Sequence, residues 1–283
     1  MENFSNGAPI FDSLTHPSFS GNWIGKTMFS DSKFSTLIAS MADNNIEAAV
    51  ACNYTLNENI PIKDFVHNCI INSNKLKLYP CLIIDQSVIN NPDIFIENII
   101  TIIPIEFPII IKINASYTSF ADYKNIIKCI HSIYKIIGKK LILYICTYPF
   151  QCSPTMRREN VFKLIDELII SNPDYKIILL HGGTVDILRY SQYAQHFNNI
   201  YLDLSFTLCR YIDSSLLYDF VYLFSQLDKK LVIGSDHPEY DYLYLRKVLS
   251  IIEMRLLRTM KNDLVIQKMS NVMISNMENI IRF

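Results

Sequence analysis

The chain has 283 residues, of which 50% are hydrophobic and 19% are charged, and its formal net charge is −1. This balance excludes long intrinsic disorder, which needs low hydrophobicity and high net charge, and no basic run of the kind that binds nucleic acid is present. Seven cysteines without a C-x-x-C pair are typical of a reduced cytoplasmic protein rather than of a disulfide scaffold.

No targeting or membrane segment is expected. The first ten residues, MENFSNGAPI, have neither the basic start nor the apolar region of a signal peptide. The longest apolar stretch, 94–113, contains Glu97, Glu106, Lys112 and two prolines, whereas a bilayer span needs about 20 mostly apolar residues. The hydrophobic residues are therefore predicted to pack inside a globular domain.

Short apolar runs, typical of strands buried on both faces, alternate with longer amphipathic runs along the whole chain. The predicted strands span 10–14, 47–52, 76–84, 107–113, 140–146, 176–181, 200–204 and 230–235. The helical patterns between and after them include 35–44, 60–72, 122–137, 157–171, 185–197, 214–226, 242–258 and 262–276.

About eight strand–helix units in series predict a parallel sheet with helical crossovers, and at this length a closed (β/α)8 TIM barrel fits best. We predict one α/β domain over residues 1–283 that ends in a C-terminal helix. An open, doubly wound sheet is the alternative, but the glycine-rich phosphate turns typical of such sheets are absent from the sequence.

Functional residues of a TIM barrel project from the carboxyl ends of its strands. Three of the seven glycines stand where the sixth and eighth predicted strands end, at Gly182, Gly183 and Gly234. Glycine permits tight turns and close backbone approach, so this clustering indicates a crowded barrel mouth. His181 and Asp236 stand beside these glycines and suit either a divalent metal or general acid–base chemistry.

Three motifs in order carry a family resemblance: Asp12-Ser-Leu-Thr-His16, Leu180-His-Gly-Gly and Ile233-Gly-Ser-Asp-His-Pro. On these motifs the chain resembles the amidohydrolase superfamily, and most of all its amidohydrolase-related branch of metal-dependent hydrolases and nonoxidative decarboxylases. The resemblance extends from the first predicted strand to the C-terminal helix, and it implies a barrel that binds metal at the carboxyl ends of its strands.

The resemblance also implies a set of metal ligands. His16 matches the second histidine of the family's His-x-His pair on strand one, but Leu14 stands where the first belongs. His181 matches the strand-six histidine and Asp236 the strand-eight aspartate. These three residues imply a site for one divalent metal ion, most readily zinc, rather than a two-metal centre, because structural and catalytic zinc sites need three or four protein ligands. With the first histidine replaced by leucine, the resemblance implies that this ion is bound weakly or is absent.

Further positions complete the predicted site. The family's strand-five histidine falls at Tyr144, or at Cys146 if the register shifts by two, so Cys146 is a further candidate ligand. Lys112 ends the fourth strand and matches a family lysine. Lys112, Tyr144, Trp23 and His237 are predicted to bind substrate, although Lys112 could instead pair with Asp203.

If the chain is active, the resemblance implies hydrolysis of a C–N or C–O acyl bond in a small molecule, with Asp236 as general base and His181 as metal ligand or oxyanion donor. Decarboxylation of a small carboxylic acid is a second enzymatic option. Because Leu14 breaks the ligand pair, the alternative is a catalytically degenerate barrel that binds a ligand or a protein. Asp236 could also simply cap the following helix. The resemblance is compatible with a homodimer.

Overall fold

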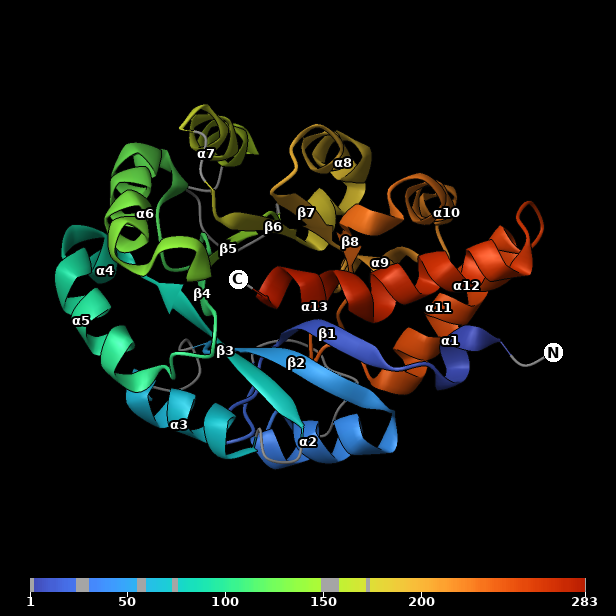
Figure 1. Cartoon of the computed structure of the whole chain (residues 1–283), viewed down its shortest axis with the longest axis horizontal. Coiled ribbons are helices and arrows are strands. Elements are labelled where there is room, and N and C mark those ends of the chain that lie inside the picture. Colours follow the sequence, from blue (N-terminus) through green and yellow to red (C-terminus); the bar gives the residue numbers. More distant parts are fainter. Residues whose placement is uncertain are drawn as a thin grey trace.

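A computed structural model describes residues 3–23, 31–54, 60–72, 76–148, 158–171 and 174–282. Within these ranges eight parallel strands form one sheet in the order of the sequence (Figure 1). The strands are β1 Ile10–Thr15, β2 Ile46–Cys52, β3 Lys77–Ile84, β4 Ile109–Ile113, β5 Leu141–Cys146, β6 Lys176–Leu180, β7 Ile200–Asp203 and β8 Leu231–Val232. The predicted (β/α)8 barrel is confirmed.

Backbone hydrogen bonds between the first and last strand regions close the barrel. Ser13 N donates to Ile233 O at 2.9 Å, and His16 N donates to His237 O at 2.8 Å. The eighth strand is much shorter than the predicted 230–235, because beyond Val232 the backbone turns toward β1. That turn carries Asp236 into the barrel mouth beside His16.

Helices cover the outside of the sheet and one end of the barrel (Figure 1). They are α1 Phe4–Gly7, α2 Phe34–Asp43, α3 Ile62–Asn72, α4 Gln86–Asn90, α5 Pro92–Ile102, α6 Tyr123–Ile137, α7 Arg158–Ile170, α8 Ile187–His196, α9 Thr207–Tyr211, α10 Leu216–Gln226, α11 Tyr242–Leu256, α12 Asn262–Ser270 and α13 Asn276–Ile281. No helix in the described ranges combines the length and apolar character needed to cross a membrane.

The predicted C-terminal helix continues further than 276 and closes the amino-terminal end of the barrel. A π-helical turn, Asn271–Ser275, joins α12 to α13. Met277 and Ile280 of α13 pack with the side chains that fill the barrel interior. At the start of β6, Lys176 donates to the carbonyl oxygens of residues 279, 280 and 282 at 2.7 to 2.8 Å. With that end filled, a ligand has access from the carboxyl ends of the strands.

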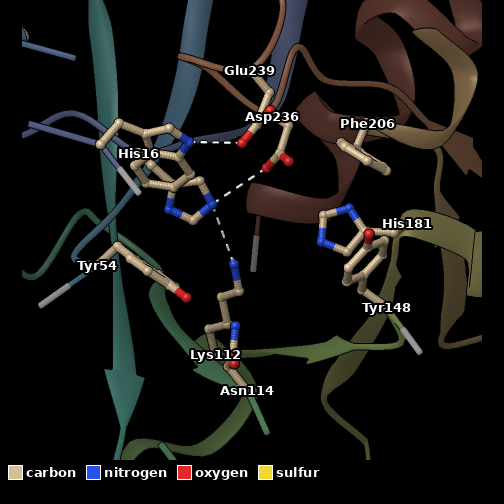
Figure 2. A pocket seen from close by; sticks show the side chains of 10 residues that line it. His16, Tyr54, Lys112, Asn114, Tyr148, His181, Phe206, Asp236 and Glu239 are labelled. Atoms are coloured by element: carbon tan, nitrogen blue, oxygen red, sulfur yellow. Dashed lines mark hydrogen bonds and ion pairs between the residues drawn. The ribbon is translucent and has the colours of Figure 1, made fainter. Parts of the chain in front are cut away.

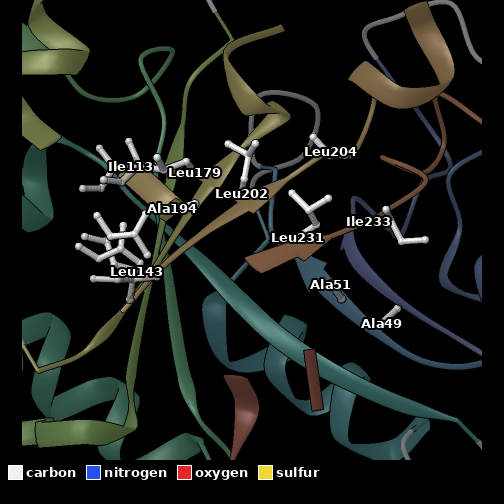
Figure 3. Close-up of a cluster of buried hydrophobic side chains, with 14 of the residues drawn as sticks. Ala49, Ala51, Ile113, Leu143, Leu179, Ala194, Leu202, Leu204, Leu231 and Ile233 are labelled. Atoms are coloured by element: carbon white, nitrogen blue, oxygen red, sulfur yellow. The ribbon is translucent and has the colours of Figure 1, made fainter. Parts of the chain in front are cut away.

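Successive side chains along each strand point alternately to two apolar clusters. One cluster lies between the sheet and the helices (Figure 3), and the other lies inside the barrel. In β4 the residues Ile109, Ile111 and Ile113 face the helices, whereas Ile110 faces the interior. Lys112 shares the inward face with Ile110 because it lies two residues further on. The alternation thus brings a lysine from an isoleucine-rich strand to the floor of the barrel mouth.

Candidate functional site

The backbone after the last three strands is strained where it meets the barrel mouth. His181, Phe206 and Asp236 follow β6, β7 and β8 with φ values of +62°, +62° and +54°. Positive φ is uncommon for residues other than glycine, and such residues persist where the surrounding structure holds them. At these three positions the turn directs a side chain toward the barrel axis, which is where functional side chains of this fold lie.

A cavity of about 160 Å³ opens at this end of the barrel (Figure 2). Five of the predicted site residues line it: His16, Trp23, Lys112, His181 and Asp236. Five more side chains complete the lining: Tyr54, Asn114, Tyr148, Phe206 and Glu239. The structure therefore brings together the predicted residues of strands one, four, six and eight.

A triad of His16, Lys112 and Asp236 runs along one side of the cavity, with His16 Nε2 between the other two side chains. His16 Nε2 is 3.3 Å from Asp236 Oδ1 and 3.4 Å from Lys112 Nζ (Figure 2). Burial would raise the pKa of Asp236, but the hydrogen bond with His16 and the positive charges around it lower that pKa below its usual value. Burial would likewise lower the pKa of Lys112, but Cys52, Cys146 and Asp236 raise it. Asp236 is thus a carboxylate and Lys112 an ammonium ion at neutral pH.

His181 lies across the cavity from this triad and is held by its own turn. Its Nδ1 is 3.1 Å from Ser205 O, so this nitrogen carries a proton and donates. Its backbone N donates to Asp203 Oδ2 at 3.1 Å. Burial would lower the pKa of His181, but the hydrogen bond with Cys146 and the nearby carboxylates raise it to about 9. A protonated ring then offers Nε2–H as a donor toward the cavity.

Asp203 was a possible partner of Lys112. Instead it accepts a hydrogen bond from the backbone N of His181 and so stabilises the turn after β6. It accepts from Ser13 Oγ at 2.5 Å and from the backbone N and side-chain hydroxyl of Ser205. Its side chain is fully buried and lies outside the cavity lining.

Three predicted site residues lie behind the cavity rather than in its lining. The thiol of Cys146 contacts His181 from the end of β5. Tyr144 is inside the barrel and donates its hydroxyl to Ser13 O at 3.1 Å. His237 is fully buried, and burial together with His16 lowers its pKa to about 3. The predicted contact of Tyr144 and His237 with substrate finds no support in the cavity lining.

The donor groups do not fit the predicted zinc site. Among the described residues, no three His, Cys, Asp or Glu side chains are arranged to hold a metal ion. Leu14, where the resemblance expects a ligand, is buried in the apolar cluster inside the barrel. The ammonium group of Lys112 lies 3.4 Å from His16 Nε2, and a fixed cation there opposes the binding of a second one.

Aromatic rings form two facing walls of the cavity (Figure 2). On one wall Trp23 stacks on His16 with ring centroids 5.1 Å apart, and Tyr54 meets the same imidazole edge-on at 5.4 Å. On the other wall Tyr148 packs against Phe206 at 5.3 Å, and both rings contact His181. These walls suit a flat ligand, because aromatic rings pair best with planar groups in offset or edge contact.

Tyr54, Phe206 and Glu239 were not predicted to be site residues. Tyr54 comes two residues after β2, and Phe206 comes three after β7, so strand-end position was the signal for both. Glu239 begins a tyrosine-rich run whose sequence fits a helix start or a dimer face, and α11 does begin within that run, at Tyr242. Glu239 itself lies in the turn before α11 and accepts from Trp23 Nε1 at 2.7 Å.

Asp236 does not cap the following helix. Asp241 is the N-cap of α11 and accepts from Tyr244 N at 2.6 Å. Asp236 lies five residues earlier and directs its carboxylate toward His16. The capping interpretation of Asp236 is therefore wrong.

Gly183→Ala should destabilise the fold by about 3 kcal/mol, the sum of an unfavourable positive φ and an overpacked contact. A Cβ at this residue would lie 2.0 Å from the ring of Tyr190, and φ is +72°. Gly182→Ala is the matched control, because its backbone is also left-handed (φ +54°, ψ +23°) and the nearest atom to the added Cβ, Leu204 Cδ2, lies 3.3 Å away. Denaturant unfolding measures both variants, and equal losses would show that the contact with Tyr190 relaxes.

No protein-family description matches the chain, and no curated protein does. Solved structures are similar. An uncharacterised TIM-barrel protein from Bordetella bronchiseptica is 14% identical, with a TM-score of 0.70 over 96% of this chain and 98% of that one. A 2-pyrone-4,6-dicarboxylic acid hydrolase from Acinetobacter baumannii is 11% identical, with a TM-score of 0.61 over 97% and 99%.

A metal-dependent hydrolase from Lactobacillus casei is 9% identical to this chain, with a TM-score of 0.62 over 99% of this chain and 97% of that one. At such identities the similarity is one of fold. The chain shares with these proteins a (β/α)8 barrel that extends over nearly its whole length.

Proposed function

We propose that this protein is a hydrolase of the amidohydrolase type that cleaves a C–O or C–N acyl bond in a small molecule at the carboxyl-end mouth of the barrel. The observation that carries the proposal is the convergence of a carboxylate, Asp236, and two cations, Lys112 and protonated His181, on one cavity. Hydrolysis of an acyl bond needs a base for the attacking water and donors for the oxyanion that forms. The names of two similar solved structures, both called hydrolases, support the same reaction class.

Each of three side chains has a distinct role in this proposal. Asp236 accepts the proton of the attacking water, and His16 holds the carboxylate in place through the contact at 3.3 Å. His181 Nε2–H stabilises the negative charge that develops on the acyl oxygen, because its Nδ1 is already committed to Ser205 O. Lys112 binds an anionic group of the substrate.

No step of this mechanism passes through a metal ion, because the donor groups of the described residues do not fit one. Metal binding stays a prediction of the family resemblance, which implies weak or single occupancy. Native mass spectrometry of protein purified without chelator measures it, and we expect less than one tightly held ion per chain.

The test is turnover by the full chain on a panel of lactones, amides and aromatic carboxylic acids, with and without a chelator. We expect hydrolysis of an ester or amide bond that survives chelation. Loss of all turnover on chelation would assign the chemistry to a metal. Release of carbon dioxide instead would assign the protein to decarboxylation.

The pH profile of turnover should fall on the alkaline side with the titration of His181. Its pKa is raised from the ordinary 6.5 to about 9, so the cationic donor form persists through neutral pH and is lost as the pH rises through about 9. On the acid side the rate should hold to below pH 4, because the pKa of Asp236 is lowered from 3.8. A rate that increases between pH 8 and 10 would contradict the donor role of His181.

The alternative is a barrel that binds a small ligand without catalysis. The specific observation in its favour is Leu14, an apolar side chain buried where the resemblance expects a metal ligand. Absence of turnover across the whole panel, together with ligand binding in the cavity, would support this alternative.

A further inference from the structure

We propose that the cavity selects a flat substrate with one carboxylate at the Lys112 end and one ammonium or N–H group at the Glu239 end. The inference rests on the proposed function only in that it calls the ligand a substrate. The class of ligand is argued from the shape and charge of the cavity, and it is tested by binding. It names Glu239, which no sequence motif singled out, as the residue that determines specificity.

The shape of the cavity comes from its two aromatic walls. Tyr54, whose ring packs against Trp23, lies across the opening from Tyr148 and Phe206 (Figure 2). Trp23 is fixed at one edge, because its indole N–H donates to Glu239 Oε1 at 2.7 Å. A cavity of about 160 Å³ between such walls accommodates a single ring more readily than a branched aliphatic group.

The Lys112 end of the cavity carries hydrogen-bond donors. Lys112 supplies an ammonium group, and Asn114 lies beside it two residues after the lysine in sequence. The side-chain oxygen of Asn114 accepts from Ser116 N at 2.8 Å, so the Nδ2 amide is the group left to donate. An ammonium and an amide N–H₂ together match the two oxygens of one carboxylate.

The Glu239 end of the cavity carries hydrogen-bond acceptors. Glu239 and Asp236 both line it, and only one oxygen of Glu239 is used by Trp23 (Figure 2). In the described part of the chain no Lys or Arg forms an ion pair with Glu239. Two acidic side chains at one edge attract an ammonium or N–H group and repel a second carboxylate of the ligand. The cavity thus discriminates against dicarboxylates.

The chain contains one tryptophan, Trp23, and it lies in the cavity wall, so its fluorescence reports binding at this site. Three matched probes are titrated into the full chain: 4-(aminomethyl)benzoate with both charges, 4-methylbenzoate with the carboxylate alone, and terephthalate with two carboxylates. We expect 4-(aminomethyl)benzoate to bind roughly tenfold tighter than 4-methylbenzoate, as one charged hydrogen bond provides, and terephthalate to bind weakest.

Glu239→Gln tests the assigned residue. Glutamine keeps an oxygen that can accept from Trp23 Nε1, so the wall stays in place while the negative charge is lost. We expect the affinity of 4-(aminomethyl)benzoate to fall roughly tenfold to that of 4-methylbenzoate, whose own affinity stays the same. Glu97→Gln, on the exposed surface of α5, is the matched control and should leave all three affinities unchanged.

The proposal is overturned if terephthalate binds more tightly than 4-(aminomethyl)benzoate, if Glu239→Gln leaves the preference intact, or if none of the three probes changes the fluorescence at millimolar concentration. Its failure is distinguishable from failure of the proposed function. The expected binding pattern without any turnover on the panel would refute the hydrolase and keep the ligand class. Turnover together with the opposite order of affinities would refute the ligand class and keep the hydrolase.

Discussion

Asp236→Asn is expected to reduce turnover roughly 10²- to 10⁴-fold, the usual cost of removing a general base. Asparagine has the same shape but cannot accept the proton of the attacking water. The carboxylate also neutralises its buried surroundings, since His16 Nε2 lies 3.3 Å away and the charges of His181 and Lys112 act on it. Unfolding free energy should therefore decrease by about 1 to 3 kcal/mol while the fold persists. Steady-state kinetics and circular dichroism measure the two effects.

Asp241→Asn is the matched control for this experiment. Asp241 caps α11 five residues further along the chain, and asparagine caps a helix as well as aspartate does. Both stability and turnover should survive this second change. Unchanged turnover in folded Asp236→Asn protein would remove Asp236 from the mechanism.

Lys112→Met is expected to raise KM roughly 10- to 100-fold for a substrate with a carboxylate, because a hydrogen bond between charged groups at a dry site contributes about 1.5 to 3 kcal/mol. The side chain is 1% exposed and is surrounded by the interior residues of the barrel. Methionine has a similar length and suits that apolar floor. Thermal stability should decrease as well, because removal of one partner from a buried group of opposite charges leaves the charge of Asp236 uncompensated.

The split between KM and kcat separates a binding role from a structural one. If Lys112 merely neutralises Asp236, methionine should change kcat more than KM. Lys135→Met on the exposed surface of α6 is the control for loss of a positive charge, and it should change neither KM nor the unfolding temperature. Kinetics on an anionic and a neutral ester of the same ring would complete the comparison.

Much of the fold could be predicted because the pattern of a parallel barrel is local. In β4 the run of isoleucines identifies a strand buried on both faces, and the period of two places Lys112 on the face of Ile110. The clustered glycines likewise marked real crowding. Gly183 has φ +72° and lies against Tyr190, and a Cβ at Gly234 would lie 2.7 Å from Asp12 Oδ1.

The order of the strands and the position of His16, Lys112, His181 and Asp236 at their carboxyl ends were determined by sequence alone, because the parallel topology brings all those ends to one mouth. The partners of each side chain there were decided only by the tertiary structure. Asp203 and Asp236 both follow strands in sequence, yet one braces the turn of His181 and the other faces His16.

Glu239 is the clearest case of a contact that only the tertiary structure decides, since the folded loops bring it to Trp23, 216 residues away in sequence. Side-chain pairing across a barrel depends on strand register and on the φ values of the turns. Both are set by packing between segments distant in sequence, and neither has a periodic signal within one segment.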